Sequence, residues 1–466
     1  MNTRIEHDLL GDMAIPADAW YGIQTQRALD NFAITGVPIS HFPHFVKALA
    51  MVKAAAARAN RDLGLLAPEK AKAILAACDD IIGGRLHEAF VVDLIQGGAG
   101  TSTNMNANEV IANLALEKLG HAKGDYAHLH PNDDVNKSQS TNDAYPTAVC
   151  VGLQFAAEPL MDAIASLKRA LEAKGLEFAD VLKMGRTQLQ DAVPMTLGQE
   201  FDAFAVNLGE DIDRIREVCL LLCEVNLGGT AIGTGINTHP QYAKLAVRHL
   251  ADLSGKPIVP AANLVEATSD MGAFVLYSGI LKRLAVKLSK VANDLRLLSS
   301  GPRTGFGEIF LPPMQPGSSI MPGKVNPVIP EAVNQVAYQV IGADLAVTLA
   351  AEAGQLQLNA MEPLIVYNLL NATQMLASAC HMLEIRCIRG IRANREQCQR
   401  HVDSSIGVIT ALVPHIGYGN ATRIASTALM SGSTVRELVV AEGLLDHAQL
   451  DALLSPASML APRTAA

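Results

Sequence analysis

Residues 266–298 carry an apolar repeat that constrains the fold of this chain more than any other feature. Two series of large apolar side chains recur at heptad spacing over about 37 Å of helix. The first series is Phe274, Leu281, Leu288 and Leu295, and the second is Tyr277, Leu284, Val291 and Leu298. Apolar residues also occupy the other faces of this segment, which predicts a helix buried on all sides. We therefore expect a bundle of helices, formed within one chain or between subunits.

The composition supports a helical core. Hydrophobic residues make up 49% of the 466 residues and aromatic residues only 4%, so Ala, Leu, Val and Ile must fill the core, which suits packed helices. The net charge of −9 argues against a nucleic-acid partner. Because no run of about 20 apolar residues is present, we expect no membrane span. The seven cysteines form no CxxC pair and the N-terminus is charged, so we expect a cytoplasmic protein with reduced thiols.

Other periodic segments predict further helices. They lie at residues 43–60, 68–82, 104–119, 147–174, 197–225 and 330–352, and a small helical unit follows residue 396. Residues 1–40 are predicted to be irregular, with short extended pieces around Ile5 and Phe32. Ten of the 23 residues from Gly301 to Gly323 are Gly or Pro, which predicts a long functional loop.

The most informative polar motif is the run GSSIMPGKVNP at residues 317–327. It combines two hydroxyls, an ammonium and an amide in a loop punctuated by Gly and Pro. Lys324 and Asn326 are suited to hold a carboxylate, and the glycines allow backbone N–H groups to face an oxyanion. A serine placed among such donors is suited to act as a base. The alternative interpretation is a flexible linker.

Four further polar clusters interrupt the apolar chain, at residues 97–106, 130–143, 183–191 and 228–235. In the first cluster, glycines precede hydroxyls at a predicted helix start, where free N–H groups bind anions. Taken alone, that run is also typical of a plain N-cap. The last cluster lacks the GxGxxG spacing and the βαβ context of a dinucleotide loop. The 13 histidines show no HExxH pair or other ligand spacing, so no catalytic metal is implied.

Together these motifs resemble the aspartase/fumarase superfamily, and the resemblance runs along essentially the whole chain. It implies a mainly all-α, three-domain fold whose central long-helix bundle assembles into the core of a homotetramer. The expected domains are residues 1–140, residues 141–396 with the catalytic loop at 315–327, and residues 397–466. The resemblance also implies β-elimination with release of fumarate. Three separated regions, each from a different subunit, are expected to meet at every active site.

The resemblance assigns a role to each expected site residue. The general base is Ser318. The carboxylate beside the lost proton is bound by Thr101, Ser140, Thr141 and Ser319. The other carboxylate is bound by Lys324 and Asn326, with help from Thr187. Two residues lie near the leaving group, Asn142 and Gln188. No cofactor is expected to be required, and activation by a divalent cation cannot be read from the sequence.

Within the superfamily, the choice lies between aspartases and fumarases. The runs at residues 98–102, 140–142 and 354–363 resemble aspartases, whereas those at 130–134 and 237–240 resemble fumarases but lie mostly outside the expected site. Gln188 stands where many members have histidine. Glutamine cannot protonate a leaving hydroxide, whereas an ammonium group leaves as ammonia without an acid. We expect reversible deamination of L-aspartate to fumarate and ammonia; the alternatives are a fumarate hydratase, another lyase of the superfamily and a non-enzymatic scaffold.

Overall fold

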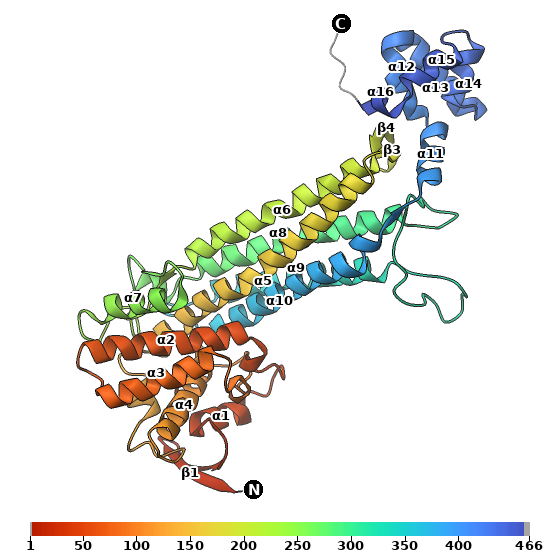
Figure 1. Ribbon diagram of the computed structural model, residues 1–466. Coiled ribbons are helices and arrows are strands. Elements are labelled where there is room, and N and C mark those ends of the chain that lie inside the picture. Colours follow the sequence, from red (N-terminus) through yellow and green to blue (C-terminus); the bar gives the residue numbers. More distant parts are fainter. Residues whose placement is uncertain (1, 461–466) are drawn as a thin grey trace. The chain divides into compact units, whose positions relative to one another are not determined.

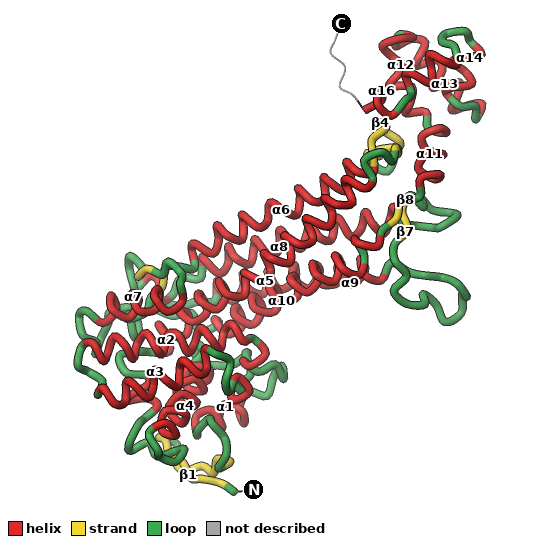
Figure 2. Tube along the Cα trace, viewed as in Figure 1, coloured by secondary structure: helices red, strands yellow, loops and turns green. Residues whose placement is uncertain are grey.

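The computed structural model describes residues 2–460, which are mainly helical as the sequence predicts (Figures 1 and 2). Five long helices dominate the fold. They are α5 (Thr141–Glu177), α6 (Leu197–Leu221), α8 (Gly272–Leu298), α9 (Val328–Glu352) and α10 (Glu362–Arg386). The strands in the described part of the chain form only two-stranded sheets, so helix packing supplies the core.

The chain forms two compact units, and each unit holds part of all five long helices. Residues 1–162, 211–285 and 337–377 make up the first unit, and residues 163–210, 286–336 and 378–466 the second. The three domains expected from the sequence, with boundaries after residues 140 and 396, remain a prediction.

The first unit contains the N-terminal elements. An antiparallel hairpin of β1 (Thr3–Asp8) and β2 (Gly11–Pro16) precedes the helices α1 (Ile23–Asn31), α2 (Pro43–Asp62), α3 (Pro68–Ile82), α4 (Thr101–Lys118) and α7 (Tyr242–Ser254). A short π-helix (Pro131–Val135) and the parallel pair β5 (Glu224–Val225) and β6 (Val259–Pro260) complete it. The alanine-rich α2 packs against α3, α4 and α7, because small side chains allow close approach.

The second unit contains the hairpin of β3 (Leu182–Thr187) and β4 (Gln190–Thr196) and the pair β7 (Ile309–Phe310) and β8 (Arg392–Ala393). Its C-terminal helices are α11 (Arg395–Ser404), α12 (Ile409–Ile416), α13 (Tyr418–Ser431), α14 (Val435–Ala441), α15 (His447–Leu453) and α16 (Pro456–Leu460). Leu182 and Met184 of the hairpin join the apolar core of these helices, so the hairpin is held by the C-terminal helices.

The apolar repeat of α8 is buried within the chain. All eight repeat residues are at most 5% exposed. Tyr277 contacts Thr373 of α10 at 3.2 Å, and Arg296 donates to Asn334 of α9 at 3.1 Å. Leu276 and Val286 on another face are about half exposed in the single chain, so burial on all sides would require a partner subunit and stays a prediction.

The helices that the sequence predicts are present, with ends shifted by a few residues in most cases. The prediction for the N-terminal region is partly wrong. Ile5 lies in β1 as expected, but Phe32 follows α1, a helix in a region that we expected to be irregular. Helix α5 is long and apolar enough by composition to cross a membrane, yet 61% of its most apolar window is buried, as is typical of a core helix in a bundle.

Candidate active site

The first segment of the expected site lies at the N-terminus of α4, in the first unit. Gly98, Ala99 and Gly100 have φ angles of +85°, +53° and +89°, so the chain turns sharply before Thr101. Glycine is required at position 100 because a Cβ atom there would lie 2.6 Å from the Tyr145 ring. Thr101 is exposed, its N–H donates to the Gly98 carbonyl oxygen, and the Gln96 side chain accepts the Thr103 N–H at 2.9 Å. The positive end of α4 is therefore only partly open to a carboxylate.

The second segment, residues 140–142, begins α5 in the same unit and is fixed by Asp143. The buried Asp143 carboxylate accepts the Ser140 N–H through Oδ1 at 2.9 Å. Its Oδ2 atom accepts the N–H groups of Gly228 and Thr230, both at 2.9 Å. Burial raises the pKa of Asp143, and these three N–H groups oppose that rise. The glycine-rich cluster after β5 thus serves to support the second segment.

A buried lysine links the first two segments. Lys53 of α2 is fully buried, and its ammonium donates to the side-chain oxygens of Asn104 (2.5 Å), Asn136 (2.9 Å) and Gln139 (2.9 Å). Asn104, in the first turn of α4, donates to the Thr141 Oγ1 atom at 3.1 Å. Because that oxygen already accepts one N–H, the Thr141 hydroxyl proton points away from Asn104 and remains available to a ligand. Burial lowers the pKa of Lys53 to about 7, although the negative charge of nearby Asp143 partly opposes this change.

The third segment, Thr187 and Gln188, lies at the tip of the β3–β4 hairpin in the second unit. Gln188 and Leu189 form its two-residue turn, with φ angles of +55° and +61°. Such turns favour Asn and Gly, so the backbone of this turn is strained, and strain of this kind clusters at functional sites. Thr187 and Gln188 are exposed, and neither side chain is hydrogen-bonded to another described residue. Both are therefore available to a ligand.

The fourth segment is the loop at residues 317–327, also in the second unit. The Ser318 Oγ atom accepts the backbone N–H groups of Ile320 at 3.1 Å and Met321 at 3.0 Å. Contacts of this kind occur in ordinary serine turns. They also place two donors on the hydroxyl oxygen, which stabilises negative charge on it. The sequence predicted loop N–H groups for this purpose without identifying them.

The base of this loop is closed by its own backbone. The Gly317 N–H donates to the Lys324 carbonyl oxygen at 2.7 Å, and the Asn326 side-chain amide donates to the Gly317 carbonyl oxygen at 2.7 Å. One N–H of Asn326 is thereby used, and the other remains for a carboxylate. Ser319 and Lys324 are exposed, and within the described chain the Lys324 ammonium forms no ion pair. The loop therefore presents a hydroxyl and a cation to its surroundings.

The four segments are brought together only in part. The first and second are joined by the chain of hydrogen bonds from Lys53 through Asn104 to Thr141. The third and fourth both belong to the second unit, but no hydrogen bond or ion pair among residues 2–460 joins the hairpin tip to the loop. The grouping of all the expected site residues at one place remains a prediction.

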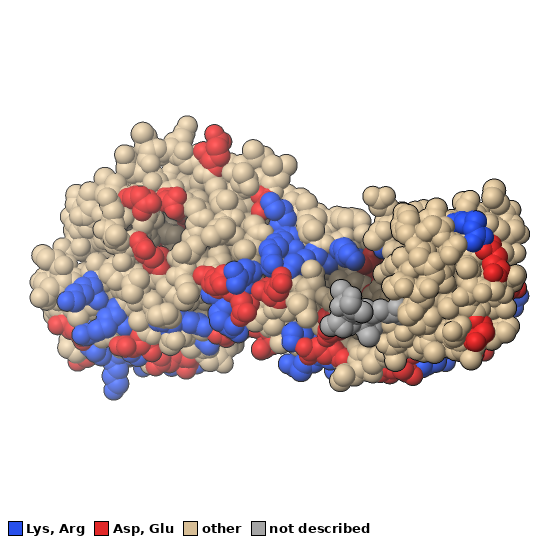
Figure 3. Space-filling view, turned by 90° about the horizontal axis from the view of Figure 1, so that it is seen from above, with Lys and Arg blue, Asp and Glu red and all other residues tan. Residues whose placement is uncertain are grey.

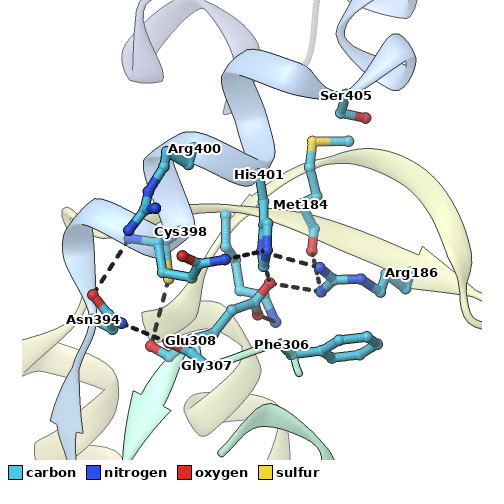
Figure 4. Close-up of polar contacts among 12 residues, drawn as sticks. Met184, Arg186, Phe306, Gly307, Glu308, Asn394, Cys398, Arg400, His401 and Ser405 are labelled. Carbon is cyan, nitrogen blue, oxygen red and sulfur yellow. Dashed lines mark hydrogen bonds and ion pairs between the residues drawn. The ribbon is translucent and has the colours of Figure 1, made fainter. Parts of the chain in front are cut away.

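A buried ion network in the second unit, which the sequence did not reveal, supports the third segment (Figure 4). The fully buried Glu308 carboxylate contacts Arg186 at 2.7 Å, His401 at 2.8 Å and Lys183 at 3.0 Å. Burial alone would raise the pKa of Glu308, but the charges of Lys183 and Arg186 and the hydrogen bond with His401 lower it below its usual value. Lys183 and Arg186 lie on β3, the strand that ends at Thr187. The network therefore fixes the strand that carries the third segment.

The same network reaches the start of the loop region. Glu308 lies in the apolar run FGEIF at residues 306–310, beside β7, and His401 lies on α11. The Asn394 side chain donates to the Gly307 carbonyl oxygen at 2.8 Å and fixes this stretch further (Figure 4). The only sequence signal was a single glutamate within a glycine-containing apolar run, and that signal does not identify its partners.

Comparison with known families gives two matches. The family described as Lyase matches residues 11–342, and the family described as Fumarase C C-terminus matches residues 408–461. The first match alone spans more than half of the chain and includes the first, second, third and fourth segments.

Individual relatives agree with these matches. Aspartate ammonia-lyase of Pseudomonas aeruginosa is 66% identical over 463 residues, which cover 99% of this chain and 98% of the relative. Aspartate ammonia-lyase of Escherichia coli (strain K12) is 54% identical over 462 residues, which cover 99% and 97%. The crystal structure of fumarate lyase:delta crystallin from Brucella melitensis bound to cobalt has a TM-score of 0.96 and 60% identity, and covers 99% and 100%. A class II fumarase from Schistosoma mansoni has a TM-score of 0.92 and 35% identity, and covers 98% and 99%.

Proposed function

The chain belongs to the lyase family of aspartases and fumarases, and from this membership we propose that it catalyses the reversible deamination of L-aspartate to fumarate and ammonia. It is a carbon–nitrogen lyase. One observation favours this conclusion over the fumarase alternative. Aspartate ammonia-lyases match at 54–66% identity along the whole chain, whereas the class II fumarase from Schistosoma mansoni matches at 35%.

In the proposed reaction, Ser318 removes a proton from Cβ of L-aspartate, the carbon beside the side-chain carboxylate. The electron pair moves into that carboxylate, which becomes an aci-carboxylate with a second negative charge. The pair then forms the double bond of fumarate, and ammonia leaves from the neighbouring carbon. The N–H groups of Ile320 and Met321 support the first step, because they stabilise the Ser318 oxygen as an anion.

Hydroxyl donors are assigned to the aci-carboxylate. They are those of Thr101, Ser140, Thr141 and Ser319. The Thr101 hydroxyl donates to the Gly98 carbonyl oxygen at 2.7 Å without substrate and would turn to the carboxylate when substrate binds. The orientation of Thr141 supports this role, because Asn104 donates to its oxygen and leaves its proton for the substrate. Preorganised neutral donors of this kind gain strength as charge develops on the carboxylate.

The other carboxylate is assigned to Lys324 and Asn326, with help from Thr187. The exposed Lys324 ammonium is suited to this role because its charge is not already neutralised by an ion pair with a described residue. Gln188 and Asn142 are assigned to the leaving group. Gln188 does not titrate, so it supplies no acid, and a departing ammonium needs none. This property favours deamination over dehydration.

We also propose a homotetramer with shared active sites. Helices α6, α8 and α9 expose large apolar side chains that a single chain leaves in water, and wide stretches of the face in Figure 3 carry no charge. Such surfaces mark interfaces between subunits. The side chains, each 48–62% exposed, are Val206, Leu220, Leu276, Val286, Tyr338, Leu345 and Leu349.

The family acts without a required organic cofactor, and no step above uses a metal. We propose a cytoplasmic location because the seven cysteines are free and six of them are buried, as suits a reducing compartment. The cellular location has no part in the chemistry of the elimination.

Two experiments test the function. Purified enzyme is mixed with L-aspartate or with L-malate, and fumarate is followed by its ultraviolet absorbance. We expect fumarate and ammonia in equal amounts from L-aspartate; fumarate from L-malate alone would contradict the proposal. The variant Ser318→Ala is expected to lose turnover while keeping its fold and its oligomeric state. Near-normal activity in that variant would exclude Ser318 as the base.

A further inference from the structure

We propose that His121, Asp125 and His128 form a binding site for one transition-metal ion, of the class that prefers imidazole ligands. The site lies in the first unit, in the loop between α4 and the π-helix. One ligand atom from each of the three side chains lies within 4.8 Å of the others. Within residues 2–460, no other group of His, Cys, Asp and Glu side chains meets this geometry.

The distances fit a shared ion better than they fit direct contacts. The Asp125 Oδ2 atom lies 3.6 Å from His121 Nδ1 and 3.7 Å from His128 Nε2. Both distances are too long for hydrogen bonds. They are close to the edge of about 3.4 Å that a tetrahedron with bonds of about 2.1 Å requires. The two histidine nitrogens lie within 4.8 Å of each other, so side-chain rotations bring all three atoms within reach of one ion.

The two imidazole rings are arranged to face the same carboxylate. The rings of His121 and His128 are stacked with centroids 3.8 Å apart and an interplanar angle of 16°. One nitrogen of each ring lies near the Asp125 carboxylate. Because the lone pair of an imidazole nitrogen lies in the plane of its ring and the two planes are nearly parallel, at least one ring must turn about its Cβ–Cγ bond to aim both nitrogens at one ion.

The backbone that carries the ligands is anchored at the residues between them. The Lys123 ammonium lies 3.6 Å from the centre of the Trp20 ring and donates to a backbone carbonyl oxygen at 2.7 Å. The Gly124 N–H donates to Asn113 at 2.8 Å. The Asn113 side-chain amide also donates a hydrogen bond to the Tyr126 hydroxyl at 3.2 Å. Ligands and anchors alternate along this loop, so the backbone that carries the ligands is held in place.

The chemistry of the ligand set indicates which ions the site would take. Two imidazoles and one carboxylate suit Zn²⁺, Co²⁺ or Ni²⁺ better than Mg²⁺ or Ca²⁺, which prefer oxygen ligands. The side chains of His121, Asp125 and His128 are 33%, 39% and 53% exposed, so water can complete the coordination. The ion would fix the loop, and it would not enter the elimination, because none of the expected site residues belongs to the set.

The motif was not recognised in the sequence because its spacing is unusual. The ligands follow the pattern H-x3-D-x2-H, which does not match a helical HExxH pair. Gly124, with a φ angle of +82°, turns the chain so that Asp125 faces both histidines. Only the folded loop shows that the three side chains converge.

The test uses the full-length enzyme after removal of metal by chelation. Equilibrium dialysis against Zn²⁺ is expected to show saturable binding of one ion per chain, with a rise in the unfolding temperature. The variants His128→Asn and Asp125→Asn are expected to weaken Zn²⁺ binding by at least about tenfold. The variant His41→Asn, at an exposed histidine elsewhere in the same unit, is expected to bind Zn²⁺ like the parent.

A second measurement separates this site from binding by cysteines. Co²⁺ added to the metal-free enzyme is expected to give a visible absorption band without the sulfur-to-metal band of thiolate ligands. The band should be lost in His128→Asn and kept in His41→Asn. The proposal is overturned if the enzyme shows no saturable binding, or if His128→Asn and Asp125→Asn bind Zn²⁺ as tightly as His41→Asn.

Discussion

The substitution Asp143→Asn removes one acceptor from the junction that fixes the second segment. In the parent, Oδ2 of Asp143 accepts two N–H groups, from Gly228 and Thr230, and Oδ1 accepts one, from Ser140. Asparagine keeps a single acceptor oxygen. That oxygen is expected to take the side with two donors, so the new NH2 group faces the Ser140 N–H. Donor then meets donor at the start of α5.

The magnitude follows from the one partly buried N–H, that of Ser140, that loses its partner. Leaving such a group unsatisfied costs about 1–3 kcal/mol, and we expect the free energy of unfolding to fall by that amount. Because the loss falls on Ser140, part of it should appear as weaker substrate binding. A share of about 1.4 kcal/mol corresponds to an increase in KM for L-aspartate of about tenfold.

A matched control exists in the same unit. The buried Glu109 carboxylate also accepts three backbone N–H groups, from Gly22 and Thr25 through one oxygen and from Gln24 through the other. The variant Glu109→Gln should lose a similar amount of stability without a change in KM. Denaturation followed by circular dichroism gives the stability, and fumarate absorbance gives KM. If the two variants have the same KM, the proposed support of Ser140 by Asp143 is refuted.

Three further predictions concern other parts of the account. The variant Glu308→Gln should lower the free energy of unfolding by about 1–3 kcal/mol, because Arg186 loses its carboxylate partner while Lys183 keeps Glu200; a loss well below about 1 kcal/mol in a denaturation experiment would show that the charge is not needed. The variant Lys324→Ala should raise KM for L-aspartate far more than it lowers kcat, and an unchanged KM in steady-state kinetics would remove its carboxylate role. The pKa of Lys53 is lowered to about 7, so from pH 7 to about pH 10 the unfolded chain binds more protons than the folded chain. Stability relative to Lys53→Met should therefore rise with pH, by about 2 kcal/mol between pH 7 and pH 9, and denaturation curves with a constant difference would contradict this.

The sequence predicted the long helices well because their signal is local and repeated. Helix α3 has the predicted bounds, and the heptad residues of α8 are buried as expected. Helix α1 was missed because its N-terminus is capped from a distance. The N–H of Ile23 donates to Glu6, and three neighbouring N–H groups donate to Glu109. No residue adjacent to α1 in the sequence indicates such a cap.

The candidate site likewise contains residues that a local motif predicts and residues that only distant contacts identify. Ser318, Lys324 and Asn326 were found because they lie in one short motif. Lys53 and Glu308 were not found, because a buried charge is recognised only through its partners, and these come from distant parts of the chain. A lysine in an alanine-rich helix carries no mark of burial in the sequence. The supporting residues of a site therefore become visible only in the folded chain.

In the proposed tetramer with shared active sites, we propose that Ser318 of one subunit acts on a substrate that Thr141 of another subunit binds. Complementation tests this claim most directly. The variants Ser318→Ala and Thr141→Ala are each assayed alone, then dissociated, mixed in equal amounts and reassembled, and fumarate formation from L-aspartate is measured. If the two residues come from different subunits, random assembly restores about a quarter of the sites, so the mixture should regain up to that fraction of the parent activity. Activity no higher than that of the separately reassembled variants would contradict the shared site.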